Sequence, residues 1–507
     1  MTCTAAPRMN WACLLEFENE RHCSSSCDLL AVPERKDIKD INDIREETLK
    51  MRRPYKDSVR RFTTRWIHGL LLAWIICPMA GIAAVEVITE IPVPSSKLPA
   101  LSWPEFRGPL GNGLVTAPGS ETPVGLALTW SETENVRWKT PIPHRGWSTP
   151  VVYGDQVWLT TATEEGNDFY ALCVDAETGG IRFNERLFHC DNPEPLGNNV
   201  NSYASPSPAI EPGRVYVHFG SYGTACLDTA TCKTLWSRQD LPCRHYRGPG
   251  SSAILFENLL VLTFDGADVQ YLAALDKETG KTVWKTDRTS VWKDLDEQGL
   301  PKREGDFRKA FSTPLAIEVG GTFQLISPGS YGAFAYEGRT GREIWKIDHG
   351  CYSPAARPVF GNGLVYVITG RGKPELWAIR PDGEGDVSGS HVAWKFTDRG
   401  VPEEPSPLLV DDLLYMVSGD GLLTCLDAAT GQPVWSERLG GNYDASPIYA
   451  DGRIYFFSVQ GKSTVLKAGR TFEVLATNKL DAGCMASPAV AGKALFLRTK
   501  THLYRIE

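Results

Sequence analysis

A segment built around Asp, Thr-Gly and Trp recurs along this chain, and the recurrence restricts the fold more than any other feature. It stands at 227–238, 275–286, 336–347 and 426–437, and the units that contain it are spaced by 40 to 61 residues. Within a unit, alternating apolar and polar runs are separated by Gly- or Asp-bearing turns, which indicates four antiparallel strands. Four-stranded units at this spacing are typical of β-propeller blades.

Eight units can be counted from their first strands. Each begins at a Ser/Thr-Pro or similar step, near residues 148, 205, 251, 312, 356, 405, 445 and 486. The eighth unit ends after three strands, and residues 128–142, which carry Trp138, supply a candidate for its fourth. Closing the ring in this way would remove the free edge of the last sheet. The sequence therefore predicts an all-β fold, an eight-bladed propeller of four-stranded antiparallel blades closed by an N-terminal strand.

The repeated residues are expected to be architectural. In the Asp-x-x-Thr-Gly turn the Asp side chain can accept backbone N–H bonds, and the Gly supplies a positive φ. A Trp on the outer strand of a blade would wedge between neighbouring sheets and bury about 150–250 Å². The residues assigned to this role are Trp138, Asp228, Trp236, Asp276, Gly280, Trp284, Gly341, Trp345, Trp394, Asp427, Gly431 and Trp435.

The first 84 residues have the character of a targeting segment. Residues 66–84 are apolar, follow three arginines and end in small residues, as a secretory signal does. A run of 19 residues can also just span a bilayer, so an uncleaved anchor is the alternative. Met51 opens a better signal than the first methionine does, and cleavage would leave an exported form that begins near Val85. A Pro-rich linker over 85–102 would then lead into the propeller at 103–507.

The repeat resembles that of a known group of propellers. Its "ALDxxTGxxxW" pattern is similar to that of the PQQ-repeat, or quinoprotein alcohol dehydrogenase-like, family and to that of the BamB-type outer-membrane assembly scaffold. The segments "WPEFRGPLGNG" at 103–113 and "AIRPDGEGDVSGSHVAW" at 378–394 are similar to those of bacterial envelope proteins with PQQ-binding-like repeats. The resemblance covers residues 103–507 and implies a propeller in the cell envelope. It implies little about chemistry, because propellers host many functions.

A candidate binding site lies where the linkers between blades emerge. Antiparallel strand order places these linkers and the second turn of each blade on one face, here called the linker face, and the Thr-Gly turns on the opposite, Thr-Gly face. Aromatic residues precede most inner strands and could plug the channel, but the Arg and His residues beside them favour a ligand or partner site. The candidate binding residues are His144, Arg145, Trp147, Tyr203, His245, Tyr246, Arg247, Arg308, Tyr352, Asn442, Tyr443 and Asp444.

The motifs of common enzyme classes are missing from the sequence, which has no hydrolase, metalloprotease, phosphate-loop or kinase signature. The family resemblance would imply PQQ held against adjacent cysteines, with calcium, but this chain has no adjacent Cys pair. Asp382, Glu384 and Asp386 are spaced like the start of a calcium loop, although its closing Glu is missing. No cofactor is therefore expected, and PQQ and calcium are only what the resemblance implies.

The cysteines suggest one covalent link. Cys190 and Cys243 lie in linkers on the same face and are predicted to form a disulfide in an oxidising compartment. Cys226 and Cys425 occupy the same place in their units, on the third strand, and are expected to be buried.

These observations favour an exported, non-enzymatic propeller of the bacterial cell envelope, in the periplasm or at a membrane. It would bind a protein partner, or an anionic small molecule or glycan, at the linker face. A net charge of −8 argues against a nucleic-acid partner, and the membrane would be contacted only through an uncleaved 66–84. The acidic pair Glu403-Glu404 is expected to be a solvated turn. The alternatives are a PQQ-dependent oxidoreductase and a polysaccharide-binding or lyase propeller.

Overall fold

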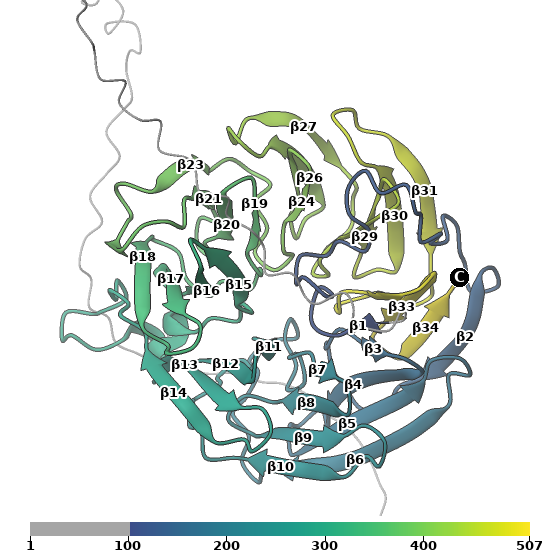
Figure 1. The fold of residues 1–507 in the computed structure, drawn as a ribbon, viewed down its shortest axis with the longest axis horizontal. Coiled ribbons are helices and arrows are strands. Elements are labelled where there is room, and N and C mark those ends of the chain that lie inside the picture. The colour runs from purple at the N-terminus through teal and green to yellow at the C-terminus, as the bar shows by residue number, and fades with distance from the viewer. Residues whose placement is uncertain (1–101) are drawn as a thin grey trace, which may run out of the picture. The chain divides into compact units, whose positions relative to one another are not determined.

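The computed structural model describes residues 102–507, and these form eight β-sheets arranged in a ring, as Figure 1 shows. The predicted eight-bladed propeller of four-stranded antiparallel blades is confirmed. The targeting segment at 66–84, the start at Met51 and all but the last residue of the linker lie outside the described residues. Within 102–507, no helix is long and apolar enough to cross a bilayer.

The first four blades follow one another along the chain. Blade 1 contains β1 (Ser102–Trp103), β3 (Val151–Tyr153), β4 (Gln156–Ala162), β5 (Asp168–Asp175) and β6 (Ile181–His189). Blade 2 contains β7 (Ala209–Glu211), β8 (Arg214–His218), β9 (Thr224–Asp228) and β10 (Thr234–Arg238). Blade 3 contains β11 (Ile254–Phe256), β12 (Leu259–Asp265), β13 (Gln270–Asp276) and β14 (Thr282–Asp287). Blade 4 contains β15 (Leu315–Val319), β16 (Thr322–Gly329), β17 (Gly332–Glu337), β18 (Glu343–Asp348) and a short added strand, β22 (Gly385–Asp386).

The other four blades complete the ring. Blade 5 contains β19 (Val359–Gly361), β20 (Leu364–Ile368), β21 (Leu376–Ile379) and β23 (Val392–Phe396). Blade 6 contains β24 (Leu408–Val410), β25 (Leu413–Val417), β26 (Leu422–Asp427) and β27 (Pro433–Arg438). Blade 7 contains β28 (Ile448–Ala450), β29 (Arg453–Phe457), β30 (Lys462–Lys467) and β31 (Val474–Lys479). Blade 8 contains β32 (Ala489–Ala491), β33 (Ala494–Arg498), β34 (His502–Ile506) and β2 (Val136–Pro141). A 3-10 segment, η1 (Lys302–Arg308), lies in the linker between blades 3 and 4.

The repeated Trp and the repeated Gly contact each other across the gap between blades. Trp236 on β10 donates its indole N–H to the carbonyl of Lys277 in the next blade, at 3.0 Å. A Cβ on Gly280, which has a φ of +70°, would lie 2.7 Å from the same indole. The same contact joins the indole of Trp138 to Gly179, of Trp284 to Gly341 and of Trp394 to Gly431. The Thr-Gly turn therefore recurs along the chain because its Gly leaves room for the tryptophan of the preceding blade.

Blade 5 lacks a Thr-Gly turn, and its replacement explains the loop that resembles a calcium site. Trp345 on β18 is fully buried and donates its indole N–H to the Gln324 side chain of its own blade, at 2.9 Å. The short strand β22 pairs in parallel with β18, with Gly385 beside Trp345. The segment after Asp382 thus covers the tryptophan that a Thr-Gly turn would otherwise receive.

The cores lie between neighbouring blades. Leu260 and Leu262 of blade 3, for example, pack with Tyr216 and Cys226 of blade 2. Cys226 and Cys425 are fully buried, as expected from their place on the third strand. The fold is therefore stabilised from blade to blade around the ring rather than by one central core.

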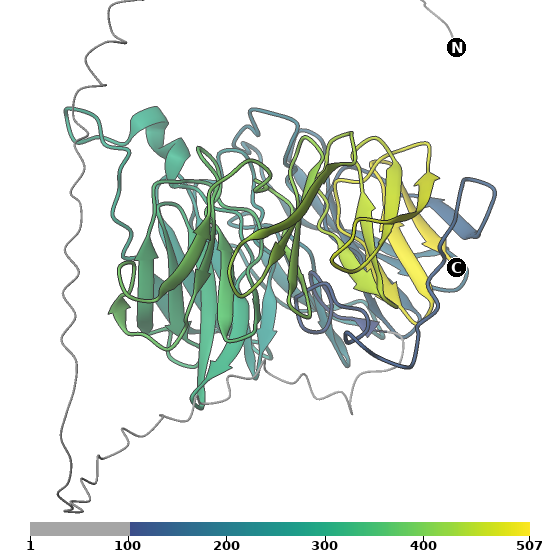
Figure 2. The same ribbon diagram turned by 90° about the horizontal axis from the view of Figure 1, so that it is seen from above.

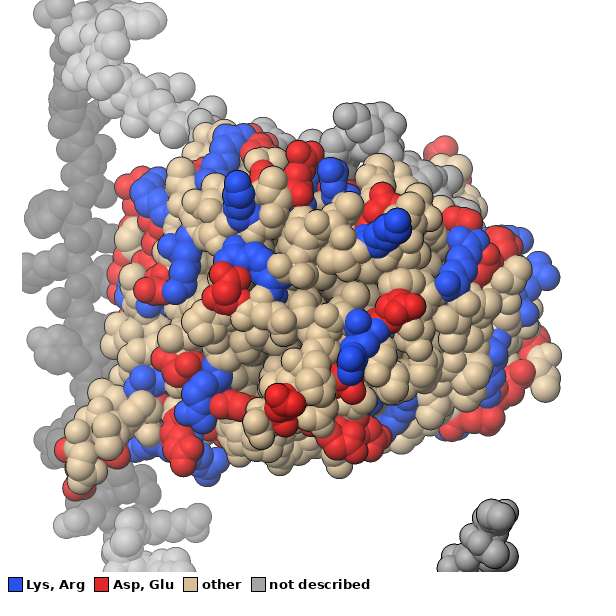
Figure 3. All heavy atoms as spheres, turned by 90° about the horizontal axis from the view of Figure 1, so that it is seen from below, with Lys and Arg blue, Asp and Glu red and all other residues tan. Residues whose placement is uncertain are grey.

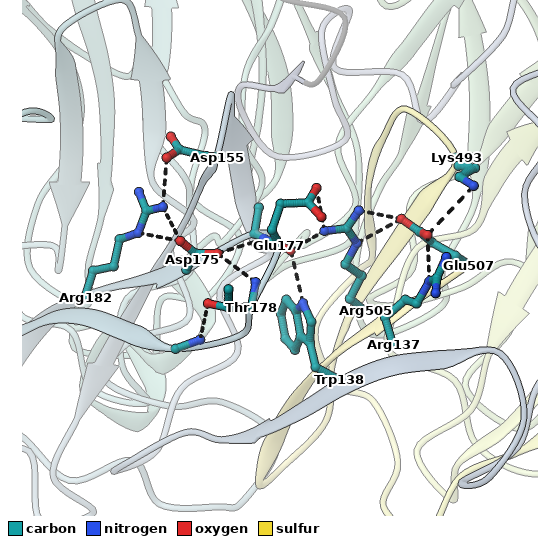
Figure 4. A network of polar contacts seen from close by, with 12 residues as sticks. Arg137, Trp138, Asp155, Asp175, Glu177, Thr178, Arg182, Lys493, Arg505 and Glu507 are labelled. Carbon is teal, nitrogen blue, oxygen red and sulfur yellow. Dashed lines mark hydrogen bonds and ion pairs between the residues drawn. The ribbon is translucent and has the colours of Figure 1, made fainter.

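The eighth blade contains β2, which lies in the chain between β1 and β3 of blade 1. Strand β2 pairs antiparallel with β34. Figure 4 shows the side chains at this junction: Trp138 donates to the carbonyl of Ala176 in blade 1, at 3.0 Å, and Arg505 on β34 donates to the same oxygen, at 2.5 Å. Glu507 forms ion pairs with Arg505 and with Arg137 of β2. These contacts join the two ends of the ring.

The faces of the propeller differ. In Figure 2 the linker that contains η1 stands on one face, and the segment after β1 crosses the other. The wall between them, seen in Figure 3, has Lys and Arg interspersed with Asp and Glu. On the side shown, the wall offers no continuous basic stripe of the kind that a nucleic acid requires.

Candidate functional site

A cavity of about 350 Å³ opens at the centre of the linker face. Its upper ring consists of the residues two positions before the Ser, Thr or Arg that precedes the Pro or Ala at the start of each blade, namely Thr149, Ser207, Ser252, Thr313, Arg357, Ser406, Ser446 and Ser487. One such residue comes from every blade: Trp147, Ser205, Gly250, Phe311, Ala355, Glu404, Asp444 and Met485. Side chains alternate along an extended chain, so a spacing of two places all eight on the same side. We refer to this cavity as the funnel.

Below this ring, the Ser/Thr-Pro steps form a belt of hydrogen bonds. The backbone N–H of Thr149 donates to the Ser207 hydroxyl in the next blade, and the N–H of Ser207 donates to the Ser252 hydroxyl, both at 2.9 Å. The same bond recurs from Ser252 to Thr313. It also recurs from Arg357 to Ser406, from Ser406 to Ser446 and from Ser446 to Ser487. The belt fixes the inner strands relative to one another and so makes the funnel wall rigid.

The floor of the funnel comes from outside the blades. Phe106, in the segment that follows β1, lines the cavity. Arg357, which takes the belt position in blade 5, donates to the carbonyl of Phe106 at 2.5 Å and pairs with Glu105 at 2.9 Å. The carbonyl of Pro104 accepts a bond from the N–H of Ile210, at 2.8 Å. Residues 102–113 therefore close the channel from the Thr-Gly face and turn it into a blind pocket.

The glycines of this segment are required by two buried guanidinium groups. A Cβ on Gly111 would lie 2.4 Å from the Arg357 guanidinium, and one on Gly113 would lie 2.8 Å from that of Arg107. Arg107 is buried and donates to the carbonyls of Asn112 and Pro407. Burial and the positive charge of Arg357 lower the pKa of Arg107 to about 9.

On one side of the funnel, two cationic side chains pair with the same carboxylate. Arg247, before blade 3, donates from Nε and Nη2 to Asp306, each at 3.1 Å. Lys309, before blade 4, pairs with the same carboxylate and donates to the carbonyl of Tyr246 at 2.7 Å. Burial lowers the pKa of Lys309 to about 8.

The other side of the funnel carries carboxylates around a single guanidinium. Arg371, in the second turn of blade 5, pairs with Glu404 and lies 3.6 Å from Glu403. Asp444 lines the funnel in the adjacent linker. Burial raises the pKa of both Glu404 and Asp444, although Arg371 acts in the opposite direction on each.

Aromatic side chains line the funnel between these charged groups. The ring of Phe307 on η1 is tilted against that of Tyr352, with centroids 4.5 Å apart, and Arg303 lies over the Phe307 ring at 5.1 Å. Trp147 stands at the opposite wall, with Arg145 at 5.1 Å from its ring. Rigid aromatic surfaces beside paired charges are typical of small-molecule binding pockets.

A second cavity adjoins the funnel at Trp147. It measures about 480 Å³ and includes His144, Arg145, Glu164 and Lys500. His144 is exposed and stacks on Tyr170 at 4.3 Å.

The structure brings together part of the predicted site. Trp147, Arg247, Tyr352 and Asp444 line the funnel, and His144 and Arg145 line the adjoining cavity. Tyr246 stands behind the wall, with Lys309 at 4.8 Å and Arg247 at 4.9 Å from its ring.

Five of the predicted residues lie elsewhere. Tyr203, His245 and Tyr443 are buried in the protein, so the expectation that they face the mouth is wrong. Arg308 pairs with the buried Asp294 at 3.0 Å, and Asn442 is exposed outside the funnel. Tyr443 lies three residues before the belt, on the opposite side of an extended chain, and Tyr203 lies in a turn, where the alternation does not apply.

Among the charged and aromatic residues of the funnel, sequence reasoning missed Phe106, Arg303, Asp306, Phe307, Lys309, Arg371 and Glu404. Glu404 was expected in a solvated turn, yet it is half-buried and ion-paired. Counting two residues back from the Ser-Pro step of blade 6 would have found it. Asp306 and Phe106 lie in segments without a repeat, where no spacing predicts direction.

The predicted metal ligands and disulfide are not supported. Among residues 102–507, no three His, Cys, Asp or Glu side chains converge on a metal position, and Asp386 accepts bonds from the Ser388 N–H and hydroxyl instead. In the funnel, Asp306 and Glu404 are engaged by cations, and the chain has no adjacent Cys pair, so the donor set does not fit PQQ with calcium. Cys190 and Cys243 are both free thiols, so the disulfide prediction is wrong.

Comparisons with known proteins agree with the fold. A quinohemoprotein alcohol dehydrogenase from Comamonas testosteroni is 12% identical, with 80% of each chain covered and a TM-score of 0.56. Another from Pseudomonas putida HK5 is 12% identical, with the same coverage and a TM-score of 0.57. BamB from Moraxella catarrhalis is 11% identical, with 73% of this chain and 99% of that chain covered and a TM-score of 0.49. No match is found among curated proteins.

At such identities the two dehydrogenase structures show the fold alone. The family model described as outer membrane protein assembly factor BamB matches residues 129–290 and 268–507, which together span all eight blades. The repeat, the ring of eight blades and this match lead to one conclusion: the chain belongs to the BamB-like family of PQQ-repeat propellers.

Proposed function

We propose that this chain is an exported, non-enzymatic propeller of the bacterial cell envelope that binds a partner in the funnel of its linker face. The blind funnel carries the proposal, because it combines a rigid belt, aromatic walls and partly exposed ion pairs in one concave site. The family description, an outer membrane assembly factor, supports a binding role in the envelope. The apolar segment at 66–84 supports export.

The charges of the funnel favour binding over catalysis. Arg247, Lys309 and Arg371 each already contact a carboxylate. The dehydrogenases that share the fold are too distant to transfer their activity, and no residue of the funnel supports that alternative.

The proposal is tested by identifying the molecules that co-purify with the protein from the cell envelope. Wild type, the double variant Trp147→Ala/Arg247→Ala and a control, Arg339→Ala, are purified under mild conditions, and co-purifying proteins and small molecules are quantified by mass spectrometry. Arg339 is exposed in a Thr-Gly turn and pairs with Glu257. We expect at least one species to fall tenfold or more in the double variant and to remain in the control. Identical profiles for all three proteins would contradict the proposal.

A further inference from the structure

The funnel has two sides of opposite charge. On the side of blades 3 and 4, Arg247 and Lys309 share the single carboxylate of Asp306, and Arg303 adds a further cation to the lining. One carboxylate cannot neutralise three cations, so this side keeps positive charge that a ligand can meet. Lys309 is almost fully buried and Arg247 is partly exposed, so the guanidinium is the accessible group.

On the side of blades 6 and 7 the balance is reversed. Glu403, Glu404 and Asp444 lie around Arg371, and the only other cation whose charge reaches Asp444 within the described residues is Lys500. Glu404 and Asp444 both line the cavity. This side therefore keeps a negative charge in a partly dehydrated position, which suits an ammonium group with its three N–H donors.

The ring places the two sides across from each other. In a closed ring of eight blades, linkers four steps apart face each other across the channel. Arg247 precedes blade 3 and Asp444 precedes blade 7, and Figure 1 shows these blades on opposite sides of the centre. Between them lie the Phe106 floor and the Trp147 wall.

We propose that the funnel binds a short peptide with both termini free. Its carboxylate binds Arg247 on the cationic side, its ammonium binds Glu404 and Asp444 on the acidic side, and an apolar side chain packs on Phe106 or Trp147. This deepens the proposed function and rests on it. The opposed carboxylates also make a purely anionic ligand a poor match, which revises the preference that the sequence suggested.

Calorimetric titration with the tripeptide Gly-Phe-Gly tests the proposal without any variant. Four forms are compared: free termini, acetylated N-terminus, amidated C-terminus and both blocked. Each block removes one charge and leaves the side chain unchanged. We expect the free form to bind, each single block to weaken binding at least tenfold, and the doubly blocked form to bind weakest. Equal binding of all four forms, or no binding of the free form at millimolar concentration, would overturn the proposal.

Two variants assign each terminus to its side of the funnel. Arg247→Gln should bind the free and amidated tripeptides equally, while it still discriminates against acetylation. Asp444→Asn should show the reverse pattern, and the surface control Arg339→Gln should match wild type. Loss of both discriminations in both variants would contradict the assignment. If a species co-purifies with wild type but not with the Trp147/Arg247 double variant, and no tripeptide binds, the proposal of a peptide ligand is refuted. The proposed binding function would then remain intact.

Discussion

A deletion of residues 1–143 should lower the melting temperature far more than a deletion of residues 1–101. The longer deletion removes β2, so β34 is left as an open edge and the contacts of Figure 4 between the ends of the ring are lost. A deletion of residues 1–128 serves as the matched control, because it removes the channel floor but keeps β2. Equal melting temperatures for the deletions of 1–128 and 1–143 would show that β2 does not stabilise the ring.

Point variants at Trp138 isolate the same junction. Trp138→Ala should lower the free energy of unfolding by about 3 kcal/mol, because a large side chain is lost between blades 8 and 1. For a domain of this size that corresponds to a fall in melting temperature of about 3–4 °C. Trp138→Phe keeps one ring but loses the hydrogen bond to Ala176 and part of the indole surface, so it should cost less, about 1–2 kcal/mol. Equal effects of both variants would contradict this account of the junction.

Acidification from pH 7.5 to pH 5 should destabilise the protein strongly through three buried histidines. Burial lowers the pKa of His218 and His349 to about 3 and that of His245 to about 4. The unfolded chain, with a His pKa of about 6.5, therefore binds more protons than the folded one between these values, so stability falls as pH drops below 6.5. Each histidine should contribute a loss of about 2 kcal/mol at pH 5.

Variants are needed to separate the histidines from the carboxyl groups. Burial raises the pKa of some carboxyl groups, such as Asp265 and Glu105, and these groups stabilise the protein as the pH falls. His349→Gln should lose about 2 kcal/mol less than wild type between pH 7.5 and pH 5 in urea unfolding, whatever its stability at pH 7.5. His144→Gln, at an exposed position, is the control and should follow wild type. Parallel pH profiles for wild type and His349→Gln would contradict the buried, neutral state of that histidine.

The blades could be predicted because their determinants are local. Within each repeat, the turn Asp, the Thr-Gly step and the Trp fix strand pairing over fewer than 20 residues, and Trp236 shows how the same residues join one blade to the next. Strand β22 was not predicted, because blade 5 replaces the Thr-Gly turn with a longer segment that returns to cover Trp345.

The site was predicted only in part because its walls combine repeated and unrepeated segments. The residue two positions before the belt faces the funnel in every blade, so the predictions for Trp147 and Asp444 agree with the structure. Glu404 holds the same position but was expected in a solvated turn. The direction of Phe106 and Asp306 depends on long-range contacts, with Arg357 and Arg247 respectively, that no local spacing reveals.

Photo-crosslinking from the two faces tests the central claim, that the protein acts through its linker face. A photoreactive amino acid is placed at Asn199 or Asn442, exposed on the linker face, and at Glu278 or Gln432, exposed in Thr-Gly turns. Cells are irradiated and adducts are identified by mass spectrometry. The account predicts adducts with the same partner from both linker-face positions and none from the Thr-Gly positions. Adducts confined to the Thr-Gly positions would contradict it.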